Sequence, residues 1–509
     1  LTIANGNANG PGGCILANDL SLSNSVVTGC TSTSHPEFGL FLNGLGGGVA
    51  AKYLNAYRVS ILGNTASTAG GGAFVYAGVF TESLISGNTV NATHCDTPDD
   101  ESCAPAFLGG GGILGGTVLT LGSTISGNTV NASRVTKYDG GAETTYQVNV
   151  GLGGGISQFP IGLYTETSFA AKAGGKRIGT AMFGADARQR VGPARAAIRA
   201  KTATVRNGGA TTKADGFVND GLGIAFSTVS GNRVTGDRQA DAKYAGGGAF
   251  SIAIYDNAEV ANSTISGNRL DAPNGAYGYG GALFAASVDL TSDTITGNAG
   301  SIAVATALPV LGPPGGAAAA KRGTAFAKAW SRWQAKHPGP RTKAATGRMK
   351  DLAPPVFDST IIANNTGLYD VACALSCTIG GSNNLIRTVA GGVTVPSDTL
   401  TSNPQLAPLA YNGGILAGAP GHPATLPMPT HLLFVGSPAI DKGSNPEGFE
   451  FDQRGPGFPR VVGAAPDIGA IEGVSLNVPN VPVPALGPWL LALLSGLLGA
   501  LGLRSRRRR

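Results

Sequence analysis

The sequence predicts an all-β fold, a right-handed parallel β-helix of roughly nine or ten coils, and three observations support this prediction. A six-residue phrase recurs along the chain, as Ser83–Asn88, Ser123–Asn128, Ser227–Asn232, Ser263–Asn268 and Asp293–Asn298, with weaker copies at Val59–Asn64 and Ser359–Asn364. A glycine cluster precedes most copies, and apolar residues alternate with small polar residues within each copy. A repeat this short cannot bury an apolar face alone, so it must stack on its neighbours.

Two positions of the phrase define the expected stack. The central apolar position should form an internal ladder with rungs about 4.8 Å apart, and it holds Ile61, Ile85, Ile125, Val229, Ile265, Ile295 and Ile361. The Gly-Asn that ends each copy is a turn signal, because glycine and asparagine tolerate positive φ. We expect its side-chain amides to hydrogen-bond along one corner, with Cys30 at the same position in the first coil; a row of ligand-binding amides is the alternative. These residues are Asn64, Asn88, Asn128, Asn232, Asn268, Asn298 and Asn364.

Other solenoids fit the pattern less well. A leucine-rich repeat is disfavoured, because leucine does not recur at fixed offsets and no helical period follows each strand. The glycine clusters followed by Ser-Gly-Asn are similar to the repeats of polymorphic outer-membrane proteins and related surface β-helices. This resemblance covers about two-thirds of the chain, and it implies an architecture rather than an activity.

The six cysteines fall in three local pairs, which favours disulfides formed in an oxidising compartment over free buried thiols. The candidate pairs are Cys14 with Cys30, Cys95 with Cys103, and Cys373 with Cys377. The five histidines are scattered and no Cys-His cluster has zinc spacing. We therefore expect no metal and no cofactor.

Basic residues are concentrated outside the repeats. Of the 36 Lys and Arg residues, ten lie within 166–220, nine within 321–351 and five in the tail from Arg504. We therefore expect an acidic solenoid over 1–402 with basic insertions at about 165–223 and 305–355, and no specific nucleic-acid partner. A basic amphipathic helix is expected over 324–336. The shorter insertions all follow the Asn corner, so they should leave the solenoid along one edge.

The segment 403–473 differs from the repeats. It contains Gly436-Ser437-Pro438-Ala439-Ile440-Asp441, Asp452-Gln453-Arg454-Gly455 and Pro466-Asp467-Ile468-Gly469-Ala470-Ile471-Glu472. These motifs resemble the choice-of-anchor Q domain of bacterial surface proteins, which ends a β-helix and precedes an anchoring signal. Paired carboxylates also suit glycosidases, but we favour a structural role in closing the open end of the solenoid. The residues concerned are Asp441, Asp452, Arg454, Asp467 and Glu472.

The C-terminus has three parts after a Pro- and Val-rich linker over 474–484. Pro484, Leu486 and Trp489 form a Pro-x-Leu-x-x-Trp motif, and an apolar stretch of about 19 residues follows from Ala485, near the length that spans a bilayer as a helix. The chain then ends in a basic cluster made of Arg504, Arg506, Arg507, Arg508 and Arg509.

This C-terminal arrangement resembles the IPTL-CTERM sorting signals, variants of the PEP-CTERM class, although Val-Pro-Ala-Leu replaces Ile-Pro-Thr-Leu. The resemblance implies an exosortase-type enzyme as partner and removal or exchange of the helix over 485–509; a simple tail anchor is the alternative. It also implies export in a Gram-negative bacterium, with an inner-membrane intermediate held by the C-terminal helix. The chain begins at Leu1, so we expect its signal peptide and N-terminal cap to be missing from this sequence.

Two functions remain open at this point. The first is an exported surface or extracellular β-helix with an adhesive, envelope or matrix role and a polysaccharide or other surface ligand. The second is a polysaccharide lyase or glycoside hydrolase, since right-handed β-helices often carry those activities. Such enzymes need clustered carboxylates on a strand face, whereas the repeat strands carry Ser, Thr and Ile, so we assign no catalytic residues and favour the first.

Overall fold

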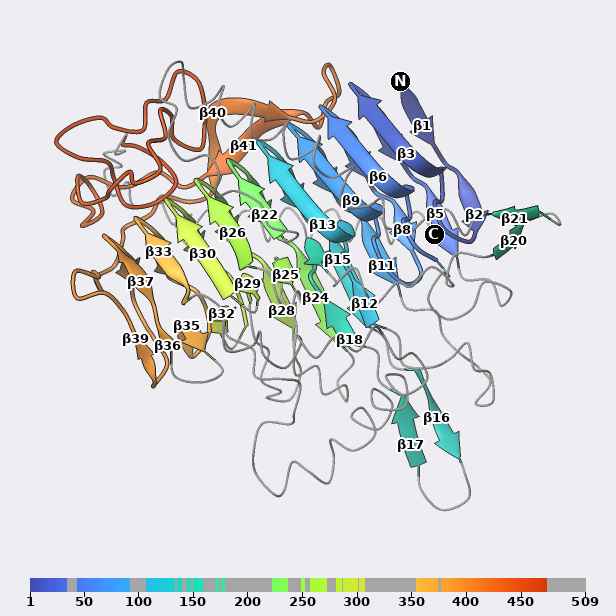
Figure 1. Ribbon diagram of the computed structural model, residues 1–509, viewed down its shortest axis with the longest axis horizontal. Coiled ribbons are helices and arrows are strands. Elements are labelled where there is room, and N and C mark those ends of the chain that lie inside the picture. Colours follow the sequence, from blue (N-terminus) through green and yellow to red (C-terminus); the bar gives the residue numbers. More distant parts are fainter. Residues whose placement is uncertain are drawn as a thin grey trace, which may run out of the picture.

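The computed structural model describes residues 1–33, 44–91, 107–132, 135–139, 144–147, 150–158, 171–173, 176–178, 222–236, 249–251, 257–271, 281–285, 287–300, 302–306, 354–373 and 377–473. Within these residues the fold is all-β, and three parallel sheets form one solenoid (Figure 1). Two of the sheets run its whole length, and the strands of the third end at Arg269–Asp271. The expected parallel β-helix architecture is therefore confirmed. The candidate helices over 324–336 and 485–503 lie outside the described residues.

The first sheet has ten short parallel strands, one from each of ten successive coils. It is formed by the recurring phrase, which explains why every strand has two or three residues between two turns. Its strands, in spatial order, are β1 (Thr2–Ala4), β4 (Val26–Thr28), β7 (Ser60–Leu62), β10 (Leu84–Ser86), β14 (Thr124–Ser126), β23 (Thr228–Ser230), β27 (Thr264–Ser266), β31 (Thr294–Thr296), β34 (Ile361–Ala363) and β38 (Leu385–Ile386).

The second sheet has seven parallel strands and follows the Asn corner. The described residues end directly after five of its strands, at residues 33, 91, 132, 236 and 271, and the predicted insertions that follow lie outside the described residues. Its strands are β2 (Asn7–Asn9), β5 (Thr31–Thr33), β8 (Thr65–Ala66), β11 (Thr89–Asn91), β15 (Thr129–Ala132), β24 (Arg233–Gly236) and β28 (Arg269–Asp271).

The third sheet has fourteen strands and begins after each glycine cluster. Its first long strands are continuous across the face, whereas later coils divide that length between two strands, so that both β19 and β22 pair with β13. Its strands are β3 (Ile15–Ser23), β6 (Val49–Tyr57), β9 (Ala73–Thr81), β13 (Ile113–Leu121), β19 (Ile156–Gln158), β22 (Leu222–Ala225), β25 (Ala249–Ser251), β26 (Asn257–Ala261), β29 (Leu283–Phe284), β30 (Ser287–Thr291), β32 (Ile302–Thr306), β33 (Val356–Asp358), β35 (Tyr369–Cys373) and β37 (Gly380–Ser382).

Five two-stranded pairs complete the described structure. The parallel pairs are β12 (Phe107–Gly109) with β18 (Val150–Leu152) and β36 (Cys377–Thr378) with β39 (Val393–Thr394). The antiparallel pairs are β16 (Val135–Asp139) with β17 (Thr144–Gln147), β20 (Ala171–Ala173) with β21 (Lys176–Ile178), and β40 (Ala410–Ala417) with β41 (Leu426–Thr430).

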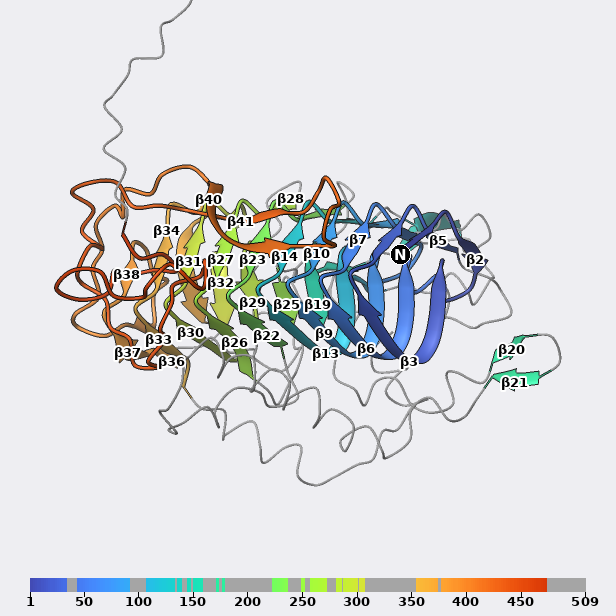
Figure 2. The same ribbon diagram turned by 90° about the horizontal axis from the view of Figure 1, so that it is seen from above.

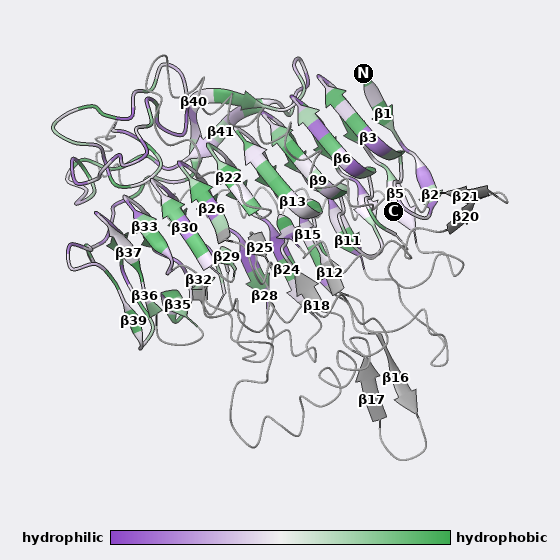
Figure 3. Cartoon of the chain, viewed as in Figure 1, coloured by the Kyte–Doolittle hydropathy of each residue, from purple (hydrophilic) through white to green (hydrophobic). Residues whose placement is uncertain are grey.

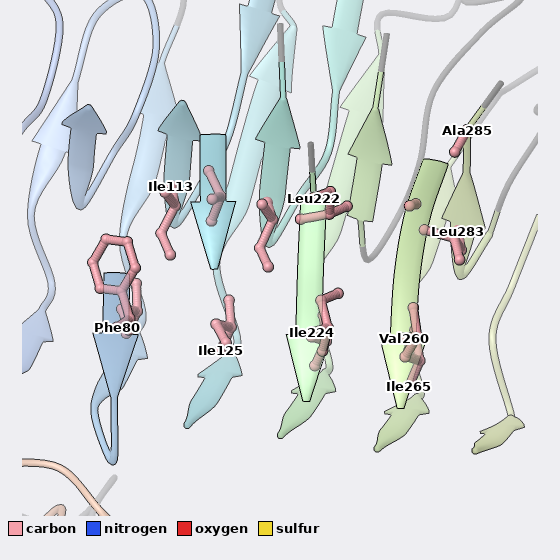
Figure 4. Close-up of a cluster of buried hydrophobic side chains, with 14 of the residues drawn as sticks. Phe80, Ile113, Ile125, Leu222, Ile224, Val260, Ile265, Leu283 and Ala285 are labelled. Carbon is pink, nitrogen blue, oxygen red and sulfur yellow. The ribbon is translucent and has the colours of Figure 1, made fainter. Parts of the chain in front are cut away.

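The core lies inside the solenoid, where side chains of the ten-stranded and fourteen-stranded sheets face one another. Ile125, Ile224 and Val260 are examples, and each is at most 2% exposed. Figure 4 shows these rungs stacked coil upon coil. Figure 3 shows hydrophobic residues concentrated along the strands of the fourteen-stranded sheet. Regular burial of this kind makes adjacent coils mutually dependent, as in other solenoids.

Candidate functional site

The segment 403–473 contacts the outer face of the ten-stranded sheet, along the flank of the solenoid. That it also closes the open end stays a prediction. Its β40–β41 hairpin runs beside β10, β14 and β23, and the rest of the segment continues toward β38 (Figure 2). The first contact is with the third coil, where the Ala419 amide donates to Ser60 Oγ at 2.8 Å. The last is with the tenth, where Asn383 Nδ2 donates to the Lys442 carbonyl at 3.0 Å.

This segment docks on the outward-facing position of the recurring phrase. In most coils that position is occupied by a residue with a side-chain hydroxyl. Thr228 Oγ1 donates to the Pro429 carbonyl at 2.9 Å, and Thr294 Oγ1 accepts from the Ala470 amide at 3.0 Å. Thr264 Oγ1 bonds Gln453 Oε1 at 2.5 Å. The central isoleucine of each phrase points inward, so alternation along the strand places these hydroxyls outside. In each repeat, the central apolar residue therefore contributes to the core, and the adjacent hydroxyl residue contributes to the docking face.

Gln453 links two coils through one buried amide. Its Nε2 donates to the Ser227 carbonyl at 3.0 Å and to Thr228 Oγ1 at 2.8 Å, while its Oε1 bonds Thr264. Gln453 is fully buried. A buried amide is stable only when its polar atoms are satisfied, and here the partners come from two adjacent rungs. The residue was part of a sequence motif, but its partners more than 180 positions away could not be predicted.

An ionic cluster forms the centre of the docked segment, and all its members are at most 5% exposed: Asp452, Arg454, Arg460, Asp467 and Glu472. Arg454 Nη2 lies 2.5 Å from Asp452 Oδ2 and donates to the Glu472 carbonyl at 2.8 Å. The Glu472 amide in turn donates to Asp452 Oδ2 at 2.9 Å. The pairing of Arg454 with Asp452 thus joins two turns that are 20 residues apart.

Glu472 is held mainly by backbone amides. Its Oε1 accepts from Val462 and its Oε2 accepts from Asp467, both at 2.8 Å. The Arg460 guanidinium lies 3.7 Å from Glu472 Oε2, which is too long for a hydrogen bond but close enough for Coulomb attraction. Burial raises the pKa of Glu472 to about 7, because loss of solvation outweighs these favourable contacts.

Asp293 connects this cluster to the solenoid. It replaces the first serine of the recurring phrase and is fully buried, with Oδ1 accepting from the Ser263 amide at 2.8 Å and Oδ2 from the Thr291 amide at 2.9 Å. Burial raises its pKa well above the ordinary range, while the charge of Arg460 acts in the opposite direction. Burial also lowers the pKa of Arg460. These opposite shifts show how costly the desolvation of this group of charges is.

His431 provides another buried contact, which no sequence motif indicated. Its Nδ1 lies 2.7 Å from the Ala407 carbonyl and its Nε2 lies 2.7 Å from Ser266 Oγ. Because a carbonyl only accepts, Nδ1 carries the proton and Nε2 accepts from the serine in the neutral ring. Burial lowers the pKa of His431, which favours that neutral form.

The predicted amide ladder is present at one corner of the solenoid. Each member donates its side-chain Nδ2 to Oδ1 of the next at 2.9 Å, and its backbone amide donates to the same oxygen at 2.9–3.0 Å. All are at most 1% exposed apart from the last, so no ligand can reach them along most of the row. The members are Asn64, Asn88, Asn128, Asn232, Asn268, Asn298 and Asn365.

Asn364 is not a ladder residue, and its assignment from the sequence was one position early. Ile362, not Ile361, pairs with Ile295, so Asn365 enters the ladder. Asn364 instead occupies the turn position that glycine holds in other copies, with φ of 59°. Asparagine tolerates this left-handed conformation, which is why the final copy could carry Asn-Asn where the others carry Gly-Asn.

A second ladder stands at the opposite end of the same short strands. The backbone amide of each phrase's first residue donates to the side-chain oxygen one coil further on, as from Ser83 to Ser123 at 3.0 Å and from Ser123 to Ser227 at 3.1 Å. The serine recurs as regularly as the asparagine, so the repeat itself carried the signal for this ladder.

Two of the three expected disulfides are present, Cys14–Cys30 and Cys373–Cys377. Cys30 occupies the asparagine position of its coil, where its amide donates to Asn64 Oδ1 at 2.9 Å. The pair Cys95 and Cys103 lies outside the described residues, as do Pro484, Leu486, Trp489 and the terminal arginines.

The chemistry of the site is that of a structural clamp. Its carboxylates accept backbone amides or pair with arginine, and Asp441 likewise accepts from the Ala464 amide at 2.9 Å. Among the residues that the structure describes, no group of three or more His, Cys, Asp or Glu side chains could hold a metal ion. Over the same residues, no helix is long and apolar enough to cross a membrane.

Comparison with known proteins adds one decisive observation. Residues 481–509 match the IPTL-CTERM motif. It is a PEP-CTERM-like signal, of the kind that exosortase-type enzymes process. The match indicates an exported protein whose C-terminal sorting signal directs it toward the cell surface. No curated protein and no solved structure matches the chain.

Proposed function

We propose that this protein is a surface-displayed or extracellular β-helix with an adhesive, envelope or matrix role. The observation that carries the proposal is the sorting signal at 481–509, which follows a solenoid of ten coils. A stacked solenoid supplies a long, stiff surface rather than one pocket, and a sorting signal supplies delivery to the cell exterior. Together they suit a protein that functions by binding other molecules outside the cell.

The docked segment supports this proposal because its charged groups are committed to the fold. Asp452 and Glu472 are at most 2% exposed and hold Arg454, Val462 and Asp467 in place. A general acid or base must reach a substrate proton, and these carboxylates face the protein interior. We interpret 403–473 as the choice-of-anchor Q module, which here fastens the chain ahead of its sorting signal along the flank of the solenoid.

The tail supplies the delivery step in this proposal. The apolar stretch that begins at Ala485 would hold an intermediate in the inner membrane of a Gram-negative cell, with Arg504 and the arginines after it on the cytoplasmic side. An exosortase-type enzyme would then release or transfer the chain. The right-handed winding of the solenoid and the membrane helix remain predictions.

The test is to express the full chain behind a host signal peptide in Gram-negative strains with and without an exosortase. We expect surface or medium localisation only with the enzyme, and an intact mass that lacks residues from about Trp489 onward. Replacing Pro484 and Leu486 by alanine should leave the chain uncleaved, whereas Val478→Ala, a control change just before the matched residues 481–509, should not. The same membrane-bound mass in both strains would overturn the proposal.

A further inference from the structure

The outer face of the seven-stranded sheet carries a regular array of uncharged polar side chains. On its first five rungs, from β2 to β15, every outward residue is Asn, Thr or Ser, while the intervening residues, such as Val90 and Val130, are fully buried. The first column of this array, called here the threonine column, contains Thr31, Thr65, Thr89 and Thr129. All four are partly exposed, and parallel pairing places them about 4.8 Å apart.

The second column is held by its own hydrogen bonds. Asn131 Nδ2 donates to Asn91 Oδ1 at 2.6 Å, and Thr235 Oγ1 donates to Asn131 Oδ1 at 2.8 Å. At the start of the sheet, Thr33 Oγ1 donates to Asn9 Oδ1 at 2.8 Å. These contacts fix side chains that would otherwise rotate freely at the surface, so a ligand that used them would lose less conformational entropy on binding.

The outer face of the ten-stranded sheet shows that a row of exposed hydroxyls on this solenoid can bind an extended chain. On the ten-stranded sheet, hydroxyls at Thr228 and Thr294 seat the chain's own 403–473 segment by bonding its backbone carbonyl and amide groups. Among the described residues, the contacts of that segment fall on the ten-stranded sheet, on the turns beside it and on the adjoining strand ends of the fourteen-stranded sheet, where Phe449 packs with Leu121, Ala225 and Ala261. None of these contacts falls on the seven-stranded sheet. One flank of the solenoid is therefore occupied by the chain itself, and the equivalent array on the other flank keeps its partly exposed hydroxyls and amides.

We propose that the outer face of the seven-stranded sheet binds an extended, neutral polysaccharide that lies along the solenoid axis. The array offers hydroxyl and amide groups that both donate and accept, and a glycan presents hydroxyls at intervals close to the rung spacing. A peptide strand is disfavoured because the backbone of the inner strands is already paired on both sides.

The charges at the end of the array favour a neutral ligand. The first charged rungs hold Arg233 and Arg269, and both arginines pair with Asp271. That pairing lowers the pKa of Asp271 despite its partial burial. Two arginines against one aspartate leave a single surplus positive charge at that end of the array, and the outward residues of the first five rungs carry no charge. An anionic glycan would therefore find no positive charge along the threonine column, whereas a neutral glycan needs none.

This inference deepens the proposed function and rests on it for the setting in which a glycan is met. The two are tested separately, because glycan binding is measured on purified full-length protein and delivery is measured in cells. Failure of delivery would leave glycan binding intact, and failure of binding would leave the sorting result intact.

The experiment measures retention of the full chain on insoluble cellulose and on insoluble β-1,3-glucan, with alginate as the anionic comparison. The test variant replaces Thr31, Thr65, Thr89 and Thr129 by valine, which keeps shape and β-branching but removes four hydroxyls. The matched control replaces Thr394 and Thr401, two exposed threonines outside the array, by valine. Melting temperatures show whether each variant folds.

We expect retention on at least one neutral glycan, unchanged by added salt, and at least about a tenfold loss of affinity in the quadruple variant but not in the control. If the quadruple variant melts early, Thr89→Val alone should still lose about threefold. The proposal is overturned if neither neutral glycan is retained, if alginate is preferred, or if a folded threonine variant binds as tightly as the native chain.

Discussion

The amide ladder and the ionic cluster solve the same problem, burial of polar groups, in opposite ways. In the ladder, each asparagine satisfies the next with neutral donors and acceptors supplied by the repeat itself. In the cluster, Arg454, Arg460 and three carboxylates are desolvated together, and each depends on partners from other turns. Neutral groups cost less to bury than charges. The ladder should therefore be insensitive to pH, whereas the cluster should respond to it.

The largest expected effect comes from breaking the cluster at its most buried cation. Arg460→Met leaves Glu472, Asp467 and Asp293 without the opposing charge, and loss of one partner from a buried ionic group costs about 3–5 kcal/mol. We expect the docked segment 403–473 to become sensitive to protease at much lower urea concentration.

The matched control for that change is Arg58→Met. Arg58 and Glu82 form a surface pair at 2.7 Å, with the arginine side chain 45% exposed. Exposed pairs contribute at most about 1 kcal/mol, so the control should shift the urea midpoint only slightly. Equal effects of the two substitutions would show that Arg460 is not held in a desolvated cluster.

The ladder can be broken at its middle. Asn128→Ala removes the side chain that bridges Asn88 and Asn232 and leaves several buried polar groups unsatisfied, at about 1–3 kcal/mol each. We expect a loss of about 3 kcal/mol in urea unfolding followed by circular dichroism. Asn131→Ala, three residues on and partly exposed, should lose less than about 1 kcal/mol. A loss from Asn128 no larger than that would mean that water replaces the amide.

The recurring phrase allowed the amide ladder to be predicted from the sequence. The ionic cluster lies outside the repeats and could be predicted only in part. A residue that repeats at every coil, such as the asparagine, must stack on itself, so its partner follows from the sequence. The sequence motifs marked Asp452 and Arg454 as structural residues, but they did not indicate that the segment contacts the flank of the solenoid. Its contacts reach from Ala419 to Ser60, across most of the chain, and no local pattern encodes such a distance. The shift at Asn364 was missed because two adjacent asparagines offer two registers.

The pH dependence of the cluster provides the next prediction. Burial raises the pKa of Glu472 from its ordinary value near 4.5 to about 7. The folded state therefore binds a proton that the unfolded state releases between these values. Stability is complete below about pH 4.5 and falls as pH rises through 7. After allowance for screening, the loss should be on the order of 1–2 kcal/mol.

Urea unfolding of the native chain and of Glu472→Gln, near pH 5 and near pH 8, measures this contribution. The substitution keeps the size of the side chain and removes its titration, so the part of the pH-dependent loss due to Glu472 should disappear. A loss of the same size in the variant would assign the effect to other groups, among which Asp452, Asp467 and Asp293 also have pKa values raised by burial.

The smallest expected effect tests the register correction. Asn364→Gly places glycine where φ is already 59°, and it should change stability by less than about 0.5 kcal/mol. Asn365→Gly removes the amide that accepts from Asn298, at 2.9 Å, and should cost about 2 kcal/mol. If the two costs were reversed in thermal unfolding, the ladder would pass through Asn364 instead.

The difference in pH dependence between the amide ladder and the ionic cluster is tested most directly by hydrogen exchange. Exchange is measured on the full chain at about pH 5 and about pH 8 and corrected for intrinsic rates. The Asn88 and Asn128 amides should keep the same protection at both values, because their acceptors are neutral amide oxygens. The Val462 and Asp467 amides, which donate to Glu472, should lose protection at the higher pH. Equal losses in both sets, or none in either, would contradict the conclusion that the ladder and the cluster are stabilised independently.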